Sequence, residues 1–192
     1  NIRLATLEEF KKVDVFIITL GLSEVWYNKE TDGVFWRAVP TDDFNPEIHS
    51  FKVASFSENK ENIKFIYNSI KSINQNSKVI FTISPVPLVA TFRPITSISA
   101  NSVSKALLRG AIDEFYREID DPFKNGLYYW PSYEMVKELF PHTYKGSPYK
   151  KDNRHIKDDC IKEIMKNFEL FYVIEKNESN PSKFNFFKRF KF

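Results

Sequence analysis

The chain has 192 residues, of which 42% are hydrophobic, and its 28 basic and 25 acidic side chains leave a net charge of +3. This length fits one domain with a tail, and the apolar fraction is enough for a sizeable core. The charge balance is too even to indicate a nucleic-acid-binding protein. No apolar run is long enough to cross a bilayer, and the single cysteine, Cys160, excludes an internal disulfide and favours a reducing, cytoplasmic compartment.

The first predicted elements are a helix and a strand. Thr6 to Glu9 has the spacing of a capping box and predicts a short helix that ends near Lys12. Residues 13–20 form a nearly continuous apolar, β-branched run, which is typical of a strand buried on both faces of a parallel sheet. Gly21 ends this strand, so the loop Gly21–Glu24 is expected at its carboxyl end.

A β-hairpin is predicted next. Residues 25–27 and 34–36 are rich in aromatic and β-branched side chains, and Asp32-Gly33 between them favours a tight turn. Residues 40–50 are expected to be irregular.

The rest of the chain alternates between helices and strands. Ser57 is a candidate cap for a helix that carries isoleucines on one face, at positions 63, 66, 70 and 73. The later elements are a buried strand at 78–84, a loop at 85–99, a helix at 101–119, a strand at 126–130, a short helix within 131–140 and a last helix at 156–171. This alternation predicts an α/β fold, a three-layer α/β/α sandwich with a mostly parallel open sheet.

The pattern that points most directly to chemistry is Asp152-x-x-His155, just before the last helix. A carboxylate three residues before an imidazole can hold one ring nitrogen and leave the other free as a general base. The predicted roles are therefore His155 as base and Asp152 as its orienter. The alternative is a solvated loop, because residues 150–159 are dense in charge.

Further candidates come from the loops at the carboxyl ends of the strands, where such folds bind ligands. Gly21 and Ser23 follow the first strand, and the Ser23 hydroxyl could donate to a developing oxyanion. Alternatively, Ser23 is satisfied by the backbone in a plain turn. Ser23 is disfavoured as a nucleophile, because no glycine follows it.

Candidate substrate-binding residues lie on the same loops and on the helix that follows the second buried strand. Asn101, Lys105 and Arg109 share a face with Ser104 that suits an anionic or sugar substrate, unless it is part of a capped, partly solvated helix. The full set is Glu24, Trp26, Ser84, Pro85, Asn101, Lys105 and Arg109.

No metal or cofactor site is predicted. His49 and His142 stand alone, without a second ligand at a suitable offset. With five glycines, the chain has no glycine-rich phosphate-binding loop. We therefore expect a small-molecule or glycan substrate and no metal, cofactor or nucleic acid.

Several segments, in the same order, resemble the GSCFA family, which looks like a branch of the SGNH/GDSL hydrolases. The resemblance extends over roughly residues 10–172 and is carried by residues 17–26, 81–88, 91–94, Asn101, Ser104-Lys105, Leu108-Arg109, Pro131–Glu134 and Asp152-x-x-His155. It implies a three-layer sheet, a serine nucleophile after the first strand, and an oxyanion hole completed by a glycine and an asparagine. It also implies that a D-x-x-H motif near the C-terminus supplies acid and base.

Asp152 and His155 match that last motif directly. Gly21-x-Ser23-Glu24 matches the block that usually reads Gly-x-Asn-Asp, so Ser23 stands where the asparagine would be. The Gly-Ser-Cys-Phe-Ala segment that names the family does not occur in this sequence. By resemblance, it and the strand that carries it would precede Asn1.

Two functions remain open. The first is the C-terminal part of a Ser-dependent SGNH-type hydrolase or acyltransferase that acts on ester or acyl groups of a carbohydrate or lipid. Without the nucleophile, this chain alone is expected to be inactive. The second is a non-catalytic SGNH-like binding module in a surface-polysaccharide pathway, with the aromatic hairpin stacking on sugar rings.

We expect an SGNH-like domain over residues 1–172 and a flexible, basic aromatic tail over 173–192. Residues 184–192 combine five Phe with three basic residues, which suits a membrane surface or a partner groove, with plain disorder as the alternative. If the nucleophile strand is missing, the strand at 13–20 has one unpaired apolar edge, through which the chain is expected to self-associate.

Overall fold

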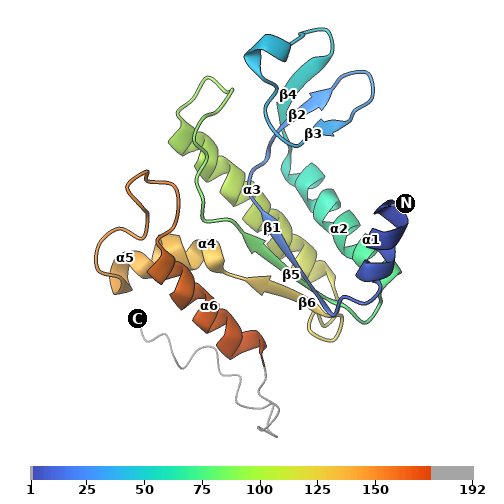
Figure 1. Ribbon diagram of the computed structural model, residues 1–192, viewed down its shortest axis with the longest axis vertical. Helices are drawn as coiled ribbons and strands as arrows, with labels where there is room; N and C mark the ends of the chain where they lie inside the picture. The colour runs from blue at the N-terminus through green and yellow to red at the C-terminus, as the bar shows by residue number, and fades with distance from the viewer. Residues whose placement is uncertain (1, 174–192) are drawn as a thin grey trace, which may run out of the picture.

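The computed structural model describes residues 2–173, so all of the expected tail except Val173 lies outside the described residues. Strands and helices alternate along the chain (Figure 1). The elements are α1 (Ile2–Phe10), β1 (Val15–Leu20), β2 (Glu24–Asn28), β3 (Val34–Phe35), η1 (Thr41–Asp43), β4 (His49–Val53), α2 (Phe56–Ile73), β5 (Lys78–Ile83), α3 (Ser97–Glu118), β6 (Leu127–Trp130), α4 (Ser132–Glu134), η2 (Met135–Leu139), α5 (Phe140–Thr143) and α6 (Asp158–Tyr172).

The main sheet consists of three parallel strands in the order β1-β5-β6. Ile17 of β1 is in register with Ile80 of β5, which in turn is in register with Tyr128 of β6. Because the strands run in one direction, their carboxyl ends lie at the same edge of the sheet. The loops after Leu20, Ile83 and Trp130 therefore meet there, as the sequence predicts.

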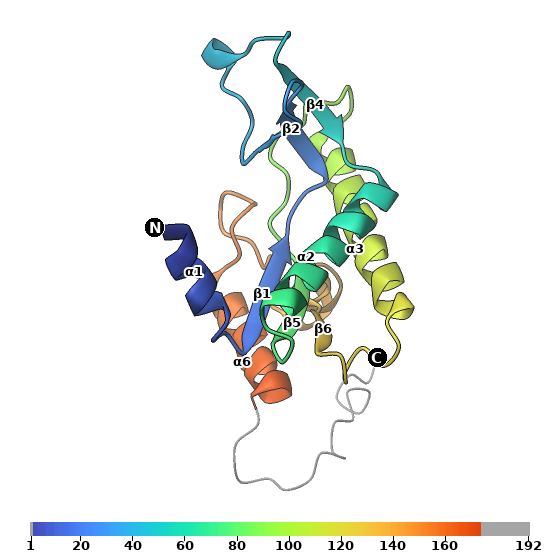
Figure 2. The same cartoon turned by 90° about the vertical axis from the view of Figure 1, so that its right-hand side faces the viewer.

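Helices cover both faces of this sheet. On one face, α2 and α3 pack over Phe81 and Leu127, with Phe115 of α3 fully buried between the layers. On the other face, α6 and the segment from α4 to α5 pack over Ile80 and Trp130. Figure 2 shows α2 and α3 to one side of β1 and β5, and α6 to the other side. The predicted three-layer α/β/α architecture is confirmed.

The prediction that the first strand is buried on both faces is wrong. Along β1, exposed and half-buried residues alternate, and Val15 and Ile17 are 43% and 53% exposed. Phe16, Ile18 and Leu20 point into the core beneath α2 and α3, whereas the core beneath α6 is built on β5 and β6. Among the described strands, β1 pairs only with β5, so its outer edge carries unpaired backbone groups. Self-association through this edge stays a prediction.

A second, antiparallel sheet has the order β3-β2-β4 (Figure 1). The predicted hairpin is confirmed, since Trp26 pairs with Phe35 and Tyr27 with Val34. Asp32 adopts φ 54° in the turn, a left-handed conformation that Asp tolerates. The prediction that residues 40–50 are irregular is wrong at its end, because His49 and Ser50 begin β4, which pairs with the whole of β2.

Three predicted helix starts are also wrong. The helix expected from residue 101 begins at Ser97, within the loop predicted at 85–99, and Thr96 is its cap. The first helix begins at Ile2, and Thr6 lies within it, with its hydroxyl donating to the Ile2 carbonyl. The cap of α2 is Ser55 and not Ser57. The Ser55 hydroxyl accepts from the Glu58 amide, and the Glu58 carboxylate accepts from the Ser55 amide, which completes a capping box.

Within residues 2–173, no helix has both the length and the apolar character that crossing a bilayer would require.

Candidate functional site

A tight loop before α6 carries the predicted base and orienter. Tyr149 and Ile156 form an isolated β-bridge, and the Lys150 amide donates to the His155 carbonyl at 2.7 Å. Asn153 at the tip has φ 55°, a left-handed conformation that Asn accepts more readily than most residues. The local backbone thus folds the chain back on itself and brings the side chains of Asp152 and His155 together.

Asp152 and His155 form a directly bonded pair. His155 Nδ1 lies 2.5 Å from Asp152 Oδ2, and Asp152 Oδ1 accepts from the backbone amides of Arg154 and His155 at 3.0 Å each. The hydrogen bond from His155 and those two amides hold the pKa of the Asp152 carboxyl well below its ordinary value. An ionised carboxylate at Nδ1 favours the tautomer whose free lone pair is on Nε2, as a general base requires.

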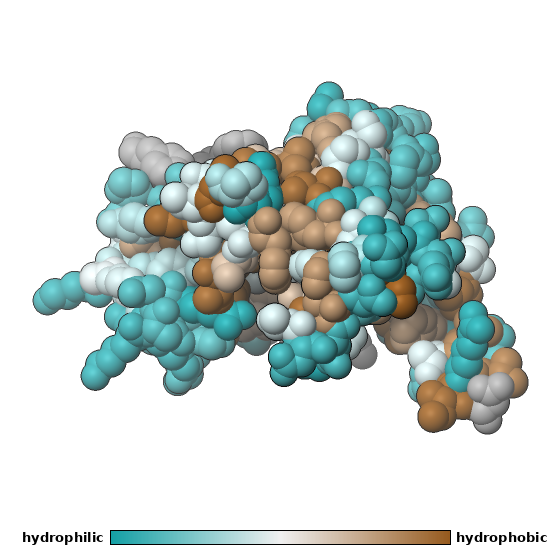
Figure 3. Space-filling model, turned by 90° about the horizontal axis from the view of Figure 1, so that it is seen from above, coloured by the Kyte–Doolittle hydropathy of each residue, from teal (hydrophilic) through white to brown (hydrophobic). Residues whose placement is uncertain are grey.

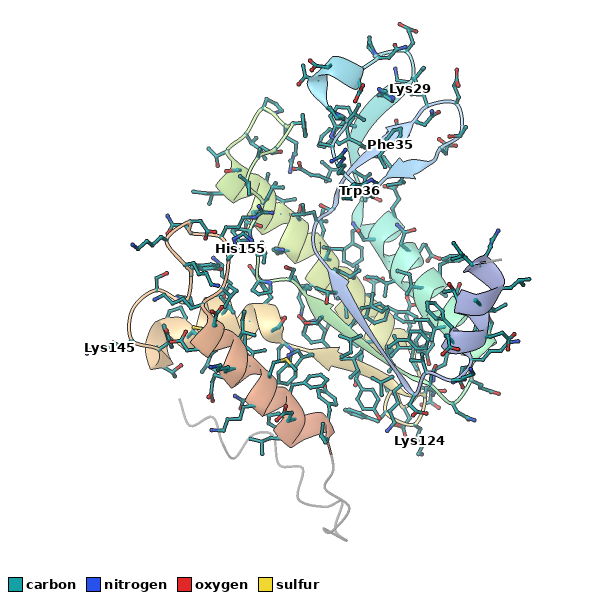
Figure 4. The ribbon with its side chains drawn as sticks, viewed as in Figure 1. Lys29, Phe35, Trp36, Lys124, Lys145 and His155 are labelled. Carbon is teal, nitrogen blue, oxygen red and sulfur yellow. The ribbon has the colours of Figure 1, made fainter. Side chains whose placement is uncertain are left out.

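The pair is accessible and lies at the carboxyl edge of the main sheet. The His155 and Asp152 side chains are 60% and 49% exposed. Tyr149 Oη donates to the Pro85 carbonyl at 3.3 Å, which ties this loop to the one that follows β5. Figure 4 shows His155 next to that loop. The loop that carries Asp152 and His155 is therefore in contact with the loop that follows β5.

Ser23 is placed differently from what an open oxyanion donor needs. It is 1% exposed, and both its amide and its hydroxyl contact Ser104 Oγ of α3, at 3.3 and 2.9 Å. In this arrangement Ser23 fastens the β1–β2 loop to α3. The role of Ser23 and Gly21 in oxyanion binding stays a prediction, and for Ser23 it requires the hydroxyl to turn away from Ser104.

Lys105 joins two loops of the same edge. Its side chain is 2% exposed, and Nζ donates to the carbonyls of Gly21 at 2.8 Å and Val86 at 3.1 Å. Burial, with a smaller contribution from Lys137, lowers the pKa of Lys105 to about 8. Two sequence candidates, Gly21 and Lys105, are thus in direct contact, and Lys105 holds backbone in place.

Most of the remaining candidates position loops in this structure. Asn101 Oδ1 accepts from the Leu88 amide at 2.9 Å, and Ser84 Oγ accepts from the Val86 amide at 3.2 Å. Glu24 accepts from Thr91 Oγ1 through both carboxylate oxygens, at 2.8 and 3.0 Å. These bonds fix the long loop between β5 and α3 over the strand ends.

Arg109 belongs to a polar cluster that sequence reasoning missed. Its Nε donates to Glu134 Oε1 at 3.0 Å, and the guanidinium lies 4.4 Å from the centre of the Tyr129 ring. Tyr129 Oη donates to the same carboxylate at 2.7 Å, and burial of the phenol raises its pKa. Glu134 lies in the segment 131–134 that resembles the family. The sequence could not predict its contact with Arg109, because the contact joins two separate helices, α3 and α4.

The aromatic hairpin contains a separate hollow. A concavity of about 210 Å³ is lined by residues 35–40 together with Asp43 and His49. Trp36 is 88% exposed, and the Arg37 guanidinium lies 4.9 Å from the centre of the Trp36 ring. Figure 4 shows Phe35 and Trp36 well apart from His155. The hollow and the Asp152–His155 pair are therefore two sites.

Metal-binding side chains do not cluster in the described part of the chain. No group of three His, Cys, Asp or Glu residues within residues 2–173 is arranged to hold an ion. Cys160 is buried in the core beneath α6.

Comparison with known proteins gave one positive result. The sequence model of the GSCFA family matches residues 2–168, which is most of the chain. No curated protein and no solved structure matched. The chain therefore belongs to the GSCFA family.

Proposed function

We propose that this chain supplies the base and its orienter to a Ser-dependent hydrolase or acyltransferase of the SGNH type. The observation that supports this most is the Asp152–His155 pair, with Nδ1 held at 2.5 Å and the ring 60% exposed at the sheet edge. The Asp152 carboxylate also accepts from the backbone amides of Arg154 and His155, which fixes its position beside the ring. The acyl group would come from a carbohydrate or lipid ester. A cytoplasmic compartment fits the single, buried cysteine.

The proposed mechanism divides the reaction between this chain and a serine outside it. As the serine oxygen attacks the acyl carbon, His155 Nε2 takes its proton, and Asp152 stabilises the resulting imidazolium. The imidazolium then donates that proton to the leaving alkoxide, which leaves an acyl-serine. Water or an acceptor hydroxyl then attacks the acyl-serine. His155 takes its proton and returns it to the serine oxygen as the acyl group is released. The nucleophilic serine that the resemblance implies would lie outside the present sequence.

The test is ester hydrolysis by the full-length natural protein that contains this sequence. His155→Ala should abolish p-nitrophenyl acetate hydrolysis, and Asp152→Asn should lower kcat by several orders of magnitude because the tautomer is lost. His142→Ala is the matched control, since His142 is an exposed histidine in α5. Undiminished turnover in His155→Ala would remove the proposal, as would hydrolysis by the 192-residue chain that survives this substitution.

The second candidate function is a carbohydrate-binding module, and the hollow on the small sheet favours it. An exposed indole beside Arg37, Asp43 and His49 combines a flat apolar surface with polar groups, as ligand sites generally do. Trp36→Ala should then weaken retention on polysaccharide gels while His155→Ala leaves it unchanged. Equal retention of both variants and the wild type would exclude this hollow as a glycan site.

A further inference from the structure

The loop between β5 and α3, together with the first turn of α3, exposes a group of apolar side chains. In this apolar loop, residues 85–98, the exposed members are Val89, Phe92, Ile95 and Ile98, at 63%, 56%, 39% and 82%. Arg93 is the only charged residue within residues 79–104. Large apolar side chains on the surface of a monomer are usually scattered singly, so several in one nearly uncharged loop indicate an interaction surface.

Polar contacts fix the backbone of the apolar loop. Thr96 Oγ1 accepts from the Ser99 amide at 3.2 Å and so caps α3. The Ile95 amide donates to the Arg93 carbonyl at 2.8 Å. Earlier in the loop, the Leu88 amide donates to the side chain of α3 described above. The exposed side chains therefore project from a loop whose shape is already set, as a surface that meets a partner requires.

The apolar loop adjoins the Asp152–His155 pair. Its first residue, Pro85, accepts through its carbonyl from Tyr149 Oη, three residues before Asp152. Leu22, in the loop after β1 at the same edge of the sheet, is also exposed, at 41%. Figure 1 shows the loop between β5 and α3 rising beside the small sheet. Figure 3 looks onto that end of the molecule and shows apolar residues gathered over the middle of the face.

Basic side chains flank the same pair. Lys151 and Arg154 are exposed, and no ion pair among the described residues involves either of them. The acidic residues of this segment already have partners, which are His155 for Asp152, Lys150 for Asp158 and Tyr144 for Asp159. The positive charges of Lys151 and Arg154 are therefore available to an anionic partner.

We propose that this face binds the surface of an anionic lipid bilayer. The apolar loop enters the lipid, and Lys151 and Arg154 meet the headgroup phosphates. A membrane contact of this kind combines apolar side chains that reach the acyl boundary with basic side chains that attract anionic lipids. The inference deepens the proposed function and rests on it in one respect, because it selects a lipid ester over a carbohydrate ester as the substrate. Vesicle binding needs no turnover, so the two proposals can fail separately.

Flotation with lipid vesicles tests the contact on the full-length natural protein that contains this sequence. Vesicles of phosphatidylcholine alone are compared with vesicles that also contain phosphatidylglycerol. We expect severalfold stronger binding to the mixed vesicles. Ile98→Asp should weaken that binding at least tenfold, because a carboxylate opposes entry into lipid. The new acid lies in the first turn of α3, where the helix dipole favours it, so the variant should fold.

Two further variants separate the apolar and the electrostatic parts. Phe65→Asp is the matched control and should bind as the wild type does, because Phe65 is 72% exposed on α2, outside the apolar loop. Lys151→Gln combined with Arg154→Gln should weaken binding to the mixed vesicles severalfold and leave binding to phosphatidylcholine unchanged. If circular dichroism shows that Ile98→Asp does not fold, Val89→Ser carries the comparison.

The outcomes tell the occupants of this face apart. The proposal is overturned if the wild type binds neither vesicle, or if the folded loop variants bind as the wild type does. It is also overturned if Ile98→Asp dissolves an oligomer that does not bind vesicles, which would assign the face to a second copy of the chain. Hydrolysis without vesicle binding would refute the membrane contact alone, and vesicle binding without hydrolysis would refute the hydrolase alone.

Discussion

Lys105 offers a direct test of how the carboxyl edge of the sheet is held together. Its ammonium is buried without a carboxylate partner among the described residues and donates to the carbonyls of Gly21 and Val86. Lys105→Met keeps the length of the side chain and removes the charge. The substitution therefore separates the cost of burying an ammonium from the packing of its stem.

The size of the effect follows from the pKa of Lys105, which burial lowers from 10.5 to about 8. Because the folded-state pKa lies below the unfolded-state value, the charged lysine destabilises the fold. At about 1.4 kcal/mol for each pKa unit, the cost is about 3 kcal/mol. It is fully present below about pH 8 and disappears as the pH rises through 10.5.

Urea denaturation of wild type and Lys105→Met at pH 7 and pH 10.5 measures this cost. The free energy of unfolding of the wild type, relative to the variant, should rise by about 3 kcal/mol between the two pH values. Lys162→Met, at an exposed lysine of α6, should show no such change. A constant difference between wild type and Lys105→Met across this pH range would refute the reasoning, because the ammonium would then titrate as it does in the unfolded chain.

Three further predictions concern stability. Ser55→Ala removes the cap of α2 and should lower the free energy of unfolding, measured by urea denaturation, by about 1 kcal/mol. Ser57→Ala should leave it nearly unchanged. A larger loss in Ser57→Ala than in Ser55→Ala would contradict the capping box. Gly126→Ala should lower the free energy of unfolding by about 1–2 kcal/mol, because φ is +67° and the new Cβ would lie 3.2 Å from a backbone oxygen. Gly21→Ala should be as stable as the wild type, because a Cβ there would have no heavy atom within 4 Å. Equal melting temperatures for the two variants would count against this. Hydrogen bonds from Lys52 and from Ser55 lower the pKa of Glu58 from 4.5 to about 2. The stabilisation that the ionised Glu58 gives the fold is therefore present above pH 4.5 and is lost as the pH falls toward 2. A Glu58→Gln variant should lose less stability over that range than the wild type, and parallel acid-denaturation curves would rule this out.

Local patterns in the sequence determined which segments became strands and helices, with β4 as the exception, and where the Asp152–His155 pair would form. The hairpin around Asp32-Gly33 and the Asp152-x-x-His155 pair are decided within a few residues, because backbone preference and short-range hydrogen bonds suffice. Strand β4 was not predicted, although its residues alternate: the ring or apolar side chains of His49, Phe51 and Val53 are separated by polar residues. This period of two is a strand signal that the sequence contains.

Tertiary structure alone decided what each of these segments faces. Ser23 meets Ser104 across 81 residues of chain, and Lys105 meets Gly21 across 84. The apolar run of β1 specifies a strand, yet its Ile17 is exposed because the helices on that face lie over β5 and β6. Periodicity fixes the two sides of an element, but burial depends on partners that distant parts of the chain bring to it.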